Sequence, residues 1–163
     1  MSTESVAHLK SRMDVVWPEF RALVGSVPQD EMDTPGVVDD WCMKELLGHV
    51  NFWAWKGARD VRAATAGKIE EIEVPQGPAM VDEWNARAAA SGKAMSAEAA
   101  VRDLELSHED ARRALEDATD EAVSIEIEGW TVGVRFAEDT YRHYREHGEQ
   151  ILAWQKQMET SEV

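Results

Sequence analysis

The chain has 163 residues, of which 17 are basic and 32 acidic, giving a formal net charge of −15 at pH 7. Such a surface repels phosphate backbones and anionic lipid headgroups, so we expect neither nucleic acid nor a membrane as a partner. At this length one hydrophobic core suffices, which predicts a single domain over residues 1–163. A lone cysteine, Cys42, and the absence of a signal-peptide pattern at the N-terminus favour a soluble protein of the cytoplasm.

The first two predicted helices are separated by a polar stretch. The first covers residues 3–27, and Pro18 inside it should bend or break it, because proline removes a backbone hydrogen bond. Its apolar stripe consists of Val6, Leu9, Met13, Val16, Phe20 and Leu23. The second helix begins after Cys42 and runs to about Ala66, where Gly67 provides the stop. We interpret Cys42 as the capping residue of this helix rather than a nucleophile, since no histidine lies near it in sequence.

A long connection follows the second helix. It spans residues 67–95 and contains several prolines and glycines, with a short helical stretch from about Met80 to Ala90. Antiparallel neighbours in a bundle need only a few linking residues. A connection of this length therefore lets the next helix run parallel to the second one.

Two further helices complete the pattern. Ser96 is a good N-cap for a helix over residues 96–118. Alternating polarity and glycines over residues 123–134 predict a short hairpin or extended loop. The last helix is predicted over residues 136–158, with two acidic residues near its start that suit the positive end of a helix dipole. Together, the four amphipathic helices and the long crossover predict an all-α four-helix bundle.

Three histidines lie on the apolar stripes of two different helices. His143 and His147 are four residues apart, so they share one face of the last helix, and His49 lies on the inward face of the second helix. A single histidine on such a stripe is more often a hydrogen-bonded core residue than a ligand. Three together favour a metal site with open positions for water or substrate, which is typical of catalytic centres. Imidazole accepts Zn²⁺, Ni²⁺, Fe²⁺ and Co²⁺ alike.

Two other polar side chains are candidates for the surroundings of such a site. Asp139 lies one turn before His143 and could bond to an imidazole N–H or act as a fourth ligand. The simpler interpretation, a charge at a helix start, is favoured on residues alone. His108 also faces inward, where it could be a polar residue at the bundle centre, a substrate contact or a solvated edge residue. No residue is assigned a catalytic role.

Aromatic side chains are numerous, with seven tryptophans in the chain. Trp53 lies one turn after His49 on the same face, so its ring could form the wall of a pocket above the metal. Weaker candidates for this wall are Trp84, Trp130 and Tyr144. Core packing is favoured for Trp41 and Trp154.

Two segments that carry the histidines resemble a known group of proteins. Asp40–His49 and Thr140–His147 are similar to the second and fourth helices of the DinB-like superfamily, which includes YfiT-type metal-dependent hydrolases and mycothiol-dependent maleylpyruvate isomerases. More narrowly, Glu83–Arg87 and Ile151–Trp154 resemble the ClbS/DfsB branch. Cys42 stands where these relatives commonly have serine or threonine, so we expect a weaker helix cap.

The resemblance implies a fold and a set of ligands. It implies an up-down-down-up bundle, often a homodimer, in which His49, His143 and His147 bind a divalent metal, usually Zn or Ni. Activities in the superfamily include thiol transfer to electrophiles, isomerisation with a thiol cofactor and, in the ClbS branch, opening of a strained ring.

We therefore expect a metal-dependent enzyme that detoxifies a small electrophile or metabolite, as a thiol S-transferase or a hydrolase, with a low-molecular-weight thiol as one candidate cofactor. Two alternatives stay open. In one, a non-enzymatic bundle sequesters a small hydrophobic metabolite in an aromatic pocket. In the other, a structural dimer contains histidines that only satisfy each other.

Overall fold

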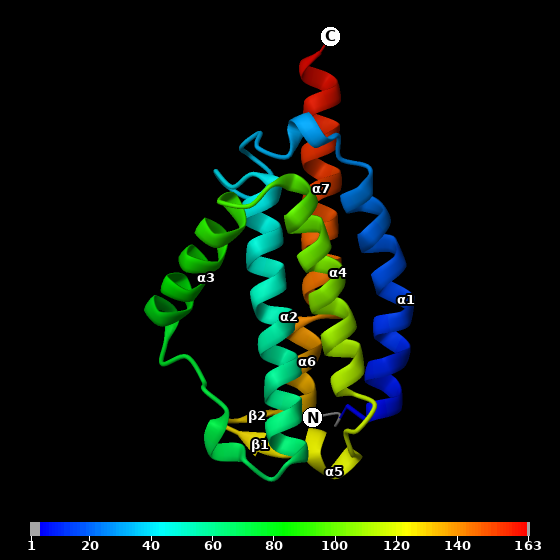
Figure 1. Cartoon of the computed structure of the whole chain (residues 1–163), viewed down its shortest axis with the longest axis vertical. Helices are drawn as coiled ribbons and strands as arrows, with labels where there is room; N and C mark the ends of the chain where they lie inside the picture. The colour runs from blue at the N-terminus through cyan, green and yellow to red at the C-terminus, as the bar shows by residue number, and fades with distance from the viewer. Residues whose placement is uncertain (1–3, 163) are drawn as a thin grey trace.

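The computed structural model describes residues 4–162 as a bundle of long helices (Figure 1). The helices that form the bundle are α1 (Val6–Gly25), α2 (Met43–Thr65), α4 (Ala97–Ala114) and the consecutive pair α6 (Val132–Asp139) and α7 (Tyr141–Ser161). In Figure 1 the chain runs up α1, down α2, down α4 and up through α6 and α7. The all-α fold and its up-down-down-up order are therefore as predicted.

The shorter elements connect these helices. They are 3₁₀ turns at Gln29–Glu31 and Ile69–Glu71, the helices α3 (Pro78–Lys93) and α5 (Asp120–Val123), and the strands β1 (Glu126–Ile127) and β2 (Trp130–Thr131). The strands pair antiparallel through a turn in which Glu128 and Gly129 both have positive φ. That backbone matches the twist of the strands, so the predicted hairpin is present but short. Val123, which we placed in it, belongs to α5 instead.

Helix α3 returns the chain to the end of the bundle where α2 begins, so that α4 can run parallel to α2 (Figure 1). It is longer than the predicted stretch of Met80 to Ala90, because Pro78 starts it at a position that tolerates proline. α2 and α3 touch where two glycines meet: a Cβ on Gly92 would lie 2.1 Å from the Lys44 carbonyl oxygen. Away from this crossing the two helices diverge (Figure 1), and side chains of both helices line the wedge between them.

Most predicted helix ends are confirmed within a few residues. α1 begins at Val6 after the N-cap Ser5, and the expected start at Thr3 lies outside the described residues. α4 is capped by Ser96 as predicted, but it ends at Ala114 rather than at residue 118. Gly67 follows the end of α2 with a φ of +73°, the left-handed conformation that favours glycine.

The prediction of one continuous last helix over residues 136–158 is wrong. α6 starts earlier, at Val132, and the helix is interrupted at Thr140, which has φ −124° and ψ −102°. The Thr140 hydroxyl donates a 2.6 Å hydrogen bond back to the Phe136 carbonyl oxygen, a local bond that competes with regular helix geometry. The apolar stripe continues across the interruption, so periodicity alone did not reveal it.

The core lies between α1, α2, α4 and α7, with α2 packed against α3, α4 and α6. Its largest fully buried side chains include Tyr144, Phe20 and Phe136. Trp154 is also buried, as predicted. Among residues 4–162, no helix combines the length and apolar character needed to cross a bilayer.

Candidate metal centre

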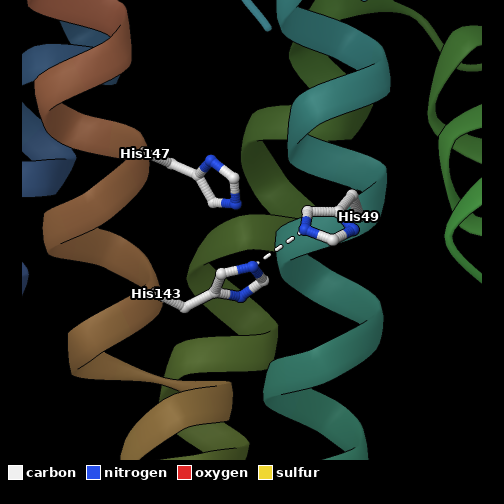
Figure 2. Close-up of side chains that lie close together, drawn as sticks. All are labelled: His49, His143 and His147. Atoms are coloured by element: carbon white, nitrogen blue, oxygen red, sulfur yellow. Dashed lines mark hydrogen bonds between the residues drawn. The ribbon is translucent and has the colours of Figure 1, made fainter. Parts of the chain in front are cut away.

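The three histidine rings face one another between α2 and α7 (Figure 2). His143 and His147 lie one turn apart on α7, with ring centroids 4.4 Å apart, and His49 reaches across from α2. The centroid of His49 lies 4.6 Å from that of His143 and 5.1 Å from that of His147. One nitrogen from each ring lies within 4.8 Å of the others, a spacing at which three imidazoles could hold one metal ion.

Burial keeps these imidazoles neutral. Burial, together with the neighbouring His147 ring, lowers the pKa of His49 to about 4. The pKa of His143 falls well below its ordinary value because of burial and of the two other rings, and burial also lowers that of His147. A metal binds the lone pair of a neutral imidazole, so the environment favours the form that a ligand requires.

The nitrogen atoms of the cluster are only partly satisfied within the chain. Nε2 of His49 lies 2.8 Å from Nε2 of His143, and Nδ1 of His147 lies 2.5 Å from Oε1 of Gln150. Nε2 of His147 and Nδ1 of both other rings are buried without a hydrogen-bond partner. An unsatisfied buried polar atom costs about 1–3 kcal/mol. The unpartnered Nε2 of His147, next to the facing Nε2 atoms of His49 and His143, forms a donor set that fits a divalent transition metal.

A cavity of about 260 Å³ opens beside the rings of His49 and His143. Trp53 of α2 and both Val81 and Asn85 of α3 line its other side. Nε1 of Trp53 donates a 2.8 Å hydrogen bond to Oδ1 of Asn85, which ties the ring to α3. Trp53 therefore lines a cavity on the open side of the histidines, and its role as the wall of a metal site stays a prediction.

Asp139 lies at the end of α6 rather than at the start of a helix, which corrects the favoured interpretation. Its half-buried side chain packs against Gly57 and lines the cavity, and burial raises the pKa of its carboxyl group to about 8. Among the described residues, the cluster of ligand atoms within 4.8 Å contains the three histidines and no carboxylate. Asp139 therefore contacts the space next to the rings without joining the cluster.

A second chamber of about 200 Å³ shares Trp53 and Asp139 with the first. Lys56 of α2 and Arg135 of α6 line it, and Lys56 is bonded to Asp60 in a buried ion pair. Trp130 lines this chamber from the hairpin rather than the cavity beside the histidines, and about half of its side chain is exposed.

The structure does not bring every predicted residue to the site. Tyr144 and His108 lie in the core towards α1, where Nδ1 of His108 is 3.3 Å from the Tyr144 hydroxyl. The His108 ring stacks on Trp17 at a centroid distance of 3.8 Å, so of our three interpretations that of a polar residue inside the bundle fits. Trp84 packs against Trp53 but lines a different cavity, on the outer side of the wedge.

Two neighbours of the site, Gln150 and Asn85, escaped the sequence analysis, and a third was assigned to the core. Gln150 follows His147 by three residues, a spacing that could have pointed to it. Asn85 belongs to α3, whose position beside α2 has no local signal in the sequence. Trp41, assigned to the core, is only half-buried and packs its ring 5.2 Å from that of His49.

The segments that carry the three histidines are similar in sequence to a known protein family. The family model for the mycothiol maleylpyruvate isomerase N-terminal domain matches residues 14–148, a range that includes all three histidines. The chain belongs to this family. The family is part of the DinB-like superfamily, as predicted, whereas membership of the narrower ClbS/DfsB branch stays a prediction. No curated protein matches the chain.

A solved structure supports the same fold for this member of the family. The crystal structure of an uncharacterised protein from Escherichia coli UTI89 superposes with a TM-score of 0.81 and covers 95% of both chains. The two sequences are 14% identical, so this likeness concerns the fold alone.

Proposed function

We propose that the protein is a divalent-metal-dependent enzyme that acts on a small electrophile, by adding either a low-molecular-weight thiol or water. The observation that carries the proposal is the convergence of three neutral, largely buried imidazoles beside an open cavity. His49, His143 and His147 would hold the ion, and Zn²⁺ and Ni²⁺ are the metals we favour. When bound at such a site, a divalent ion lowers the pKa of a coordinated water or thiol.

The chain's own residues would organise the reaction space. Oε1 of Gln150 accepts a hydrogen bond from Nδ1–H of His147, which leaves Nε2 with its lone pair towards the other rings. Trp53 and Val81 provide an apolar wall that excludes water from one side of the cavity. The bond from Trp53 to Asn85 holds this wall in place, so an apolar part of a substrate can pack against a fixed ring.

Metal analysis of protein purified without a histidine tag tests the proposal directly. We expect close to one equivalent of Zn or Ni per chain in the wild type and little in His147→Ala. His8→Ala is the matched control, because His8 is exposed and pairs with Glu4 away from the site. Equal and negligible metal in all three proteins, after incubation with either ion, would overturn the proposal.

A second experiment separates catalysis from sequestration of a metabolite. An enzyme of the proposed kind consumes electrophile and thiol only while metal is bound, so chelation should stop turnover. A binding module would instead quench tryptophan fluorescence on adding the metabolite, with or without a chelator. Trp53 is the reporter, since it lines the cavity.

A further inference from the structure

A second cavity lies on the other side of the aromatic side chains that wall the histidine site. The wedge between α2 and α3 is divided by Phe52, Trp53 and Trp84, whose ring centroids lie 5.2 to 6.0 Å apart. Trp53 faces the histidines, whereas Phe52 and Trp84 line an outer cavity of about 460 Å³. We name this space, lined by Phe52, Trp55, Arg59, Glu73, Trp84 and Arg87, the outer chamber.

The outer chamber follows from the way α2 and α3 pack. Gly48 and Gly92 bring the two backbones into contact, and a Cβ on Gly48 would lie 2.3 Å from the Ala88 carbonyl oxygen. Beyond this contact the helices diverge (Figure 1), and the lining of the space between them includes the flat rings of Phe52, Trp55 and Trp84. A wedge of fixed shape with aromatic walls is suited to a planar ligand, because flat rings stack at little entropic cost.

The chamber contains two arginines although the molecule is strongly acidic. Arg59 and Arg87 line the chamber against one acidic residue, Glu73, in a chain whose net charge is −15. Arg87 is bonded to Glu83 at the rim. Arg59 has no ion-pair partner within residues 4–162, although its neighbours on α2, Lys56 and Arg62, are both paired. A guanidinium with unused donors binds a carboxylate through two parallel hydrogen bonds.

We propose that the outer chamber binds a small aromatic carboxylate, with the ring stacked between Trp55 and Trp84 and the acid group on Arg59 and Arg87. This site is separate from the histidine cluster and does not depend on a metal. Because Trp84 packs against Trp53, a ligand here contacts the back of the wall that limits the histidine cavity.

Isothermal titration calorimetry with naphthoate tests the proposal on the full-length protein after treatment with a chelator. We expect saturable binding of one naphthoate per chain and weakening by about 10-fold or more in the double variant Arg59→Gln/Arg87→Gln, since charge-assisted hydrogen bonds are lost. Naphthamide, which keeps the ring without the charge, should bind about 10-fold more weakly than naphthoate. Trp84→Leu should weaken both compounds.

The controls separate this site from the histidine cluster. Arg113→Gln removes an exposed arginine of α4 away from the chamber and should leave binding unchanged. His147→Ala should also bind naphthoate like the wild type, even if metal binding is lost. No saturable heat up to millimolar naphthoate, equal binding by the double variant, or loss of binding in His147→Ala would each overturn the proposal. Far-UV circular dichroism checks that every variant is folded.

Discussion

Nδ1 of His147 lies 2.5 Å from Oε1 of Gln150, so a side chain one turn further along α7 determines which nitrogen of this histidine carries the proton. An amide oxygen only accepts hydrogen bonds, hence Nδ1 donates and Nε2 keeps its lone pair. Nε2 is buried without a partner and belongs to the three-histidine cluster. The contact therefore leaves Nε2 of His147 in the form that the proposed metal ion would bind.

Replacing Gln150 tests whether its contact with His147 favours metal binding. We expect Gln150→Ala to weaken metal binding by about 10–100-fold, as is usual when the partner of a ligating histidine is lost. Competition with a chromophoric chelator measures the affinity. Gln150→Glu, which retains an acceptor, should preserve or increase it. An unchanged affinity in Gln150→Ala would show that the contact does not orient the ring.

Removal of metal should lower the thermal stability of the wild type. Saturating a site at 100 times its dissociation constant stabilises the folded state by about 2.7 kcal/mol, which for a domain of this size raises Tm by about 5–10 °C. Differential scanning fluorimetry with Zn²⁺ and then with excess EDTA measures the difference. His147→Ala should melt at the same temperature in both buffers. If the wild type melted at the same temperature with Zn²⁺ and with excess EDTA, that result would contradict a metal in this site.

His108 should make the protein less stable in mild acid. Burial lowers its pKa from 6.5 to about 4, with Asp14 and Arg112 acting in opposite directions. Between these values the unfolded chain binds a proton that the folded one does not, so stability is lost as pH falls from 6.5 towards 4, by up to roughly 3 kcal/mol in total. Above pH 6.5 the residue has no such effect.

Urea unfolding at several pH values, for the wild type and His108→Gln, measures this contribution. The variant loses stacking on Trp17 and should be less stable at pH 8, but its stability should fall less steeply below pH 6.5. The other buried histidines affect both proteins equally, so the difference isolates His108. Parallel pH profiles would show that His108 is already charged in the folded state.

The glycine contact between α2 and α3 should not tolerate a methyl group. Gly48→Ala places Cβ 2.3 Å from the backbone oxygen of Ala88, so the helices must separate, and overpacking of this kind costs about 1–3 kcal/mol. Chemical denaturation measures the loss. Gly25→Ala is the matched control, because its Cβ meets only the flexible end of Arg21 at 3.1 Å. Equal stability of both variants would contradict a rigid crossing.

Helical periodicity was sufficient to predict that the three histidines lie close together. His143 and His147 share a face because they are four residues apart, and His49 lies on a stripe that must face the core. The long crossover predicted correctly that the two middle helices run parallel. Tyr144, by contrast, directly follows His143, so it is rotated by about 100° and points towards α1 instead.

The residues around the histidines could not be predicted in the same way, because their positions depend on contacts between distant segments. Asp139 was placed by counting back along a helix assumed to be continuous, but the interruption at Thr140 puts it at the end of α6. The positions of Trp84 and Asn85 depend on how α3 lies on α2, which is set by a pair of glycines 44 residues apart in sequence, Gly48 and Gly92. A close approach between two backbones leaves no periodic pattern in the sequence.

The interruption at Thr140 lies between the helix that carries the histidine pair and the helix that lines the neighbouring chamber. The register of His143 and His147 is fixed within α7, whereas the residues that shape the neighbouring chamber, among them Arg135 and Asp139, belong to α6. Substitutions in α6 or the hairpin would therefore change the walls of this chamber without changing the helical spacing of the paired imidazoles.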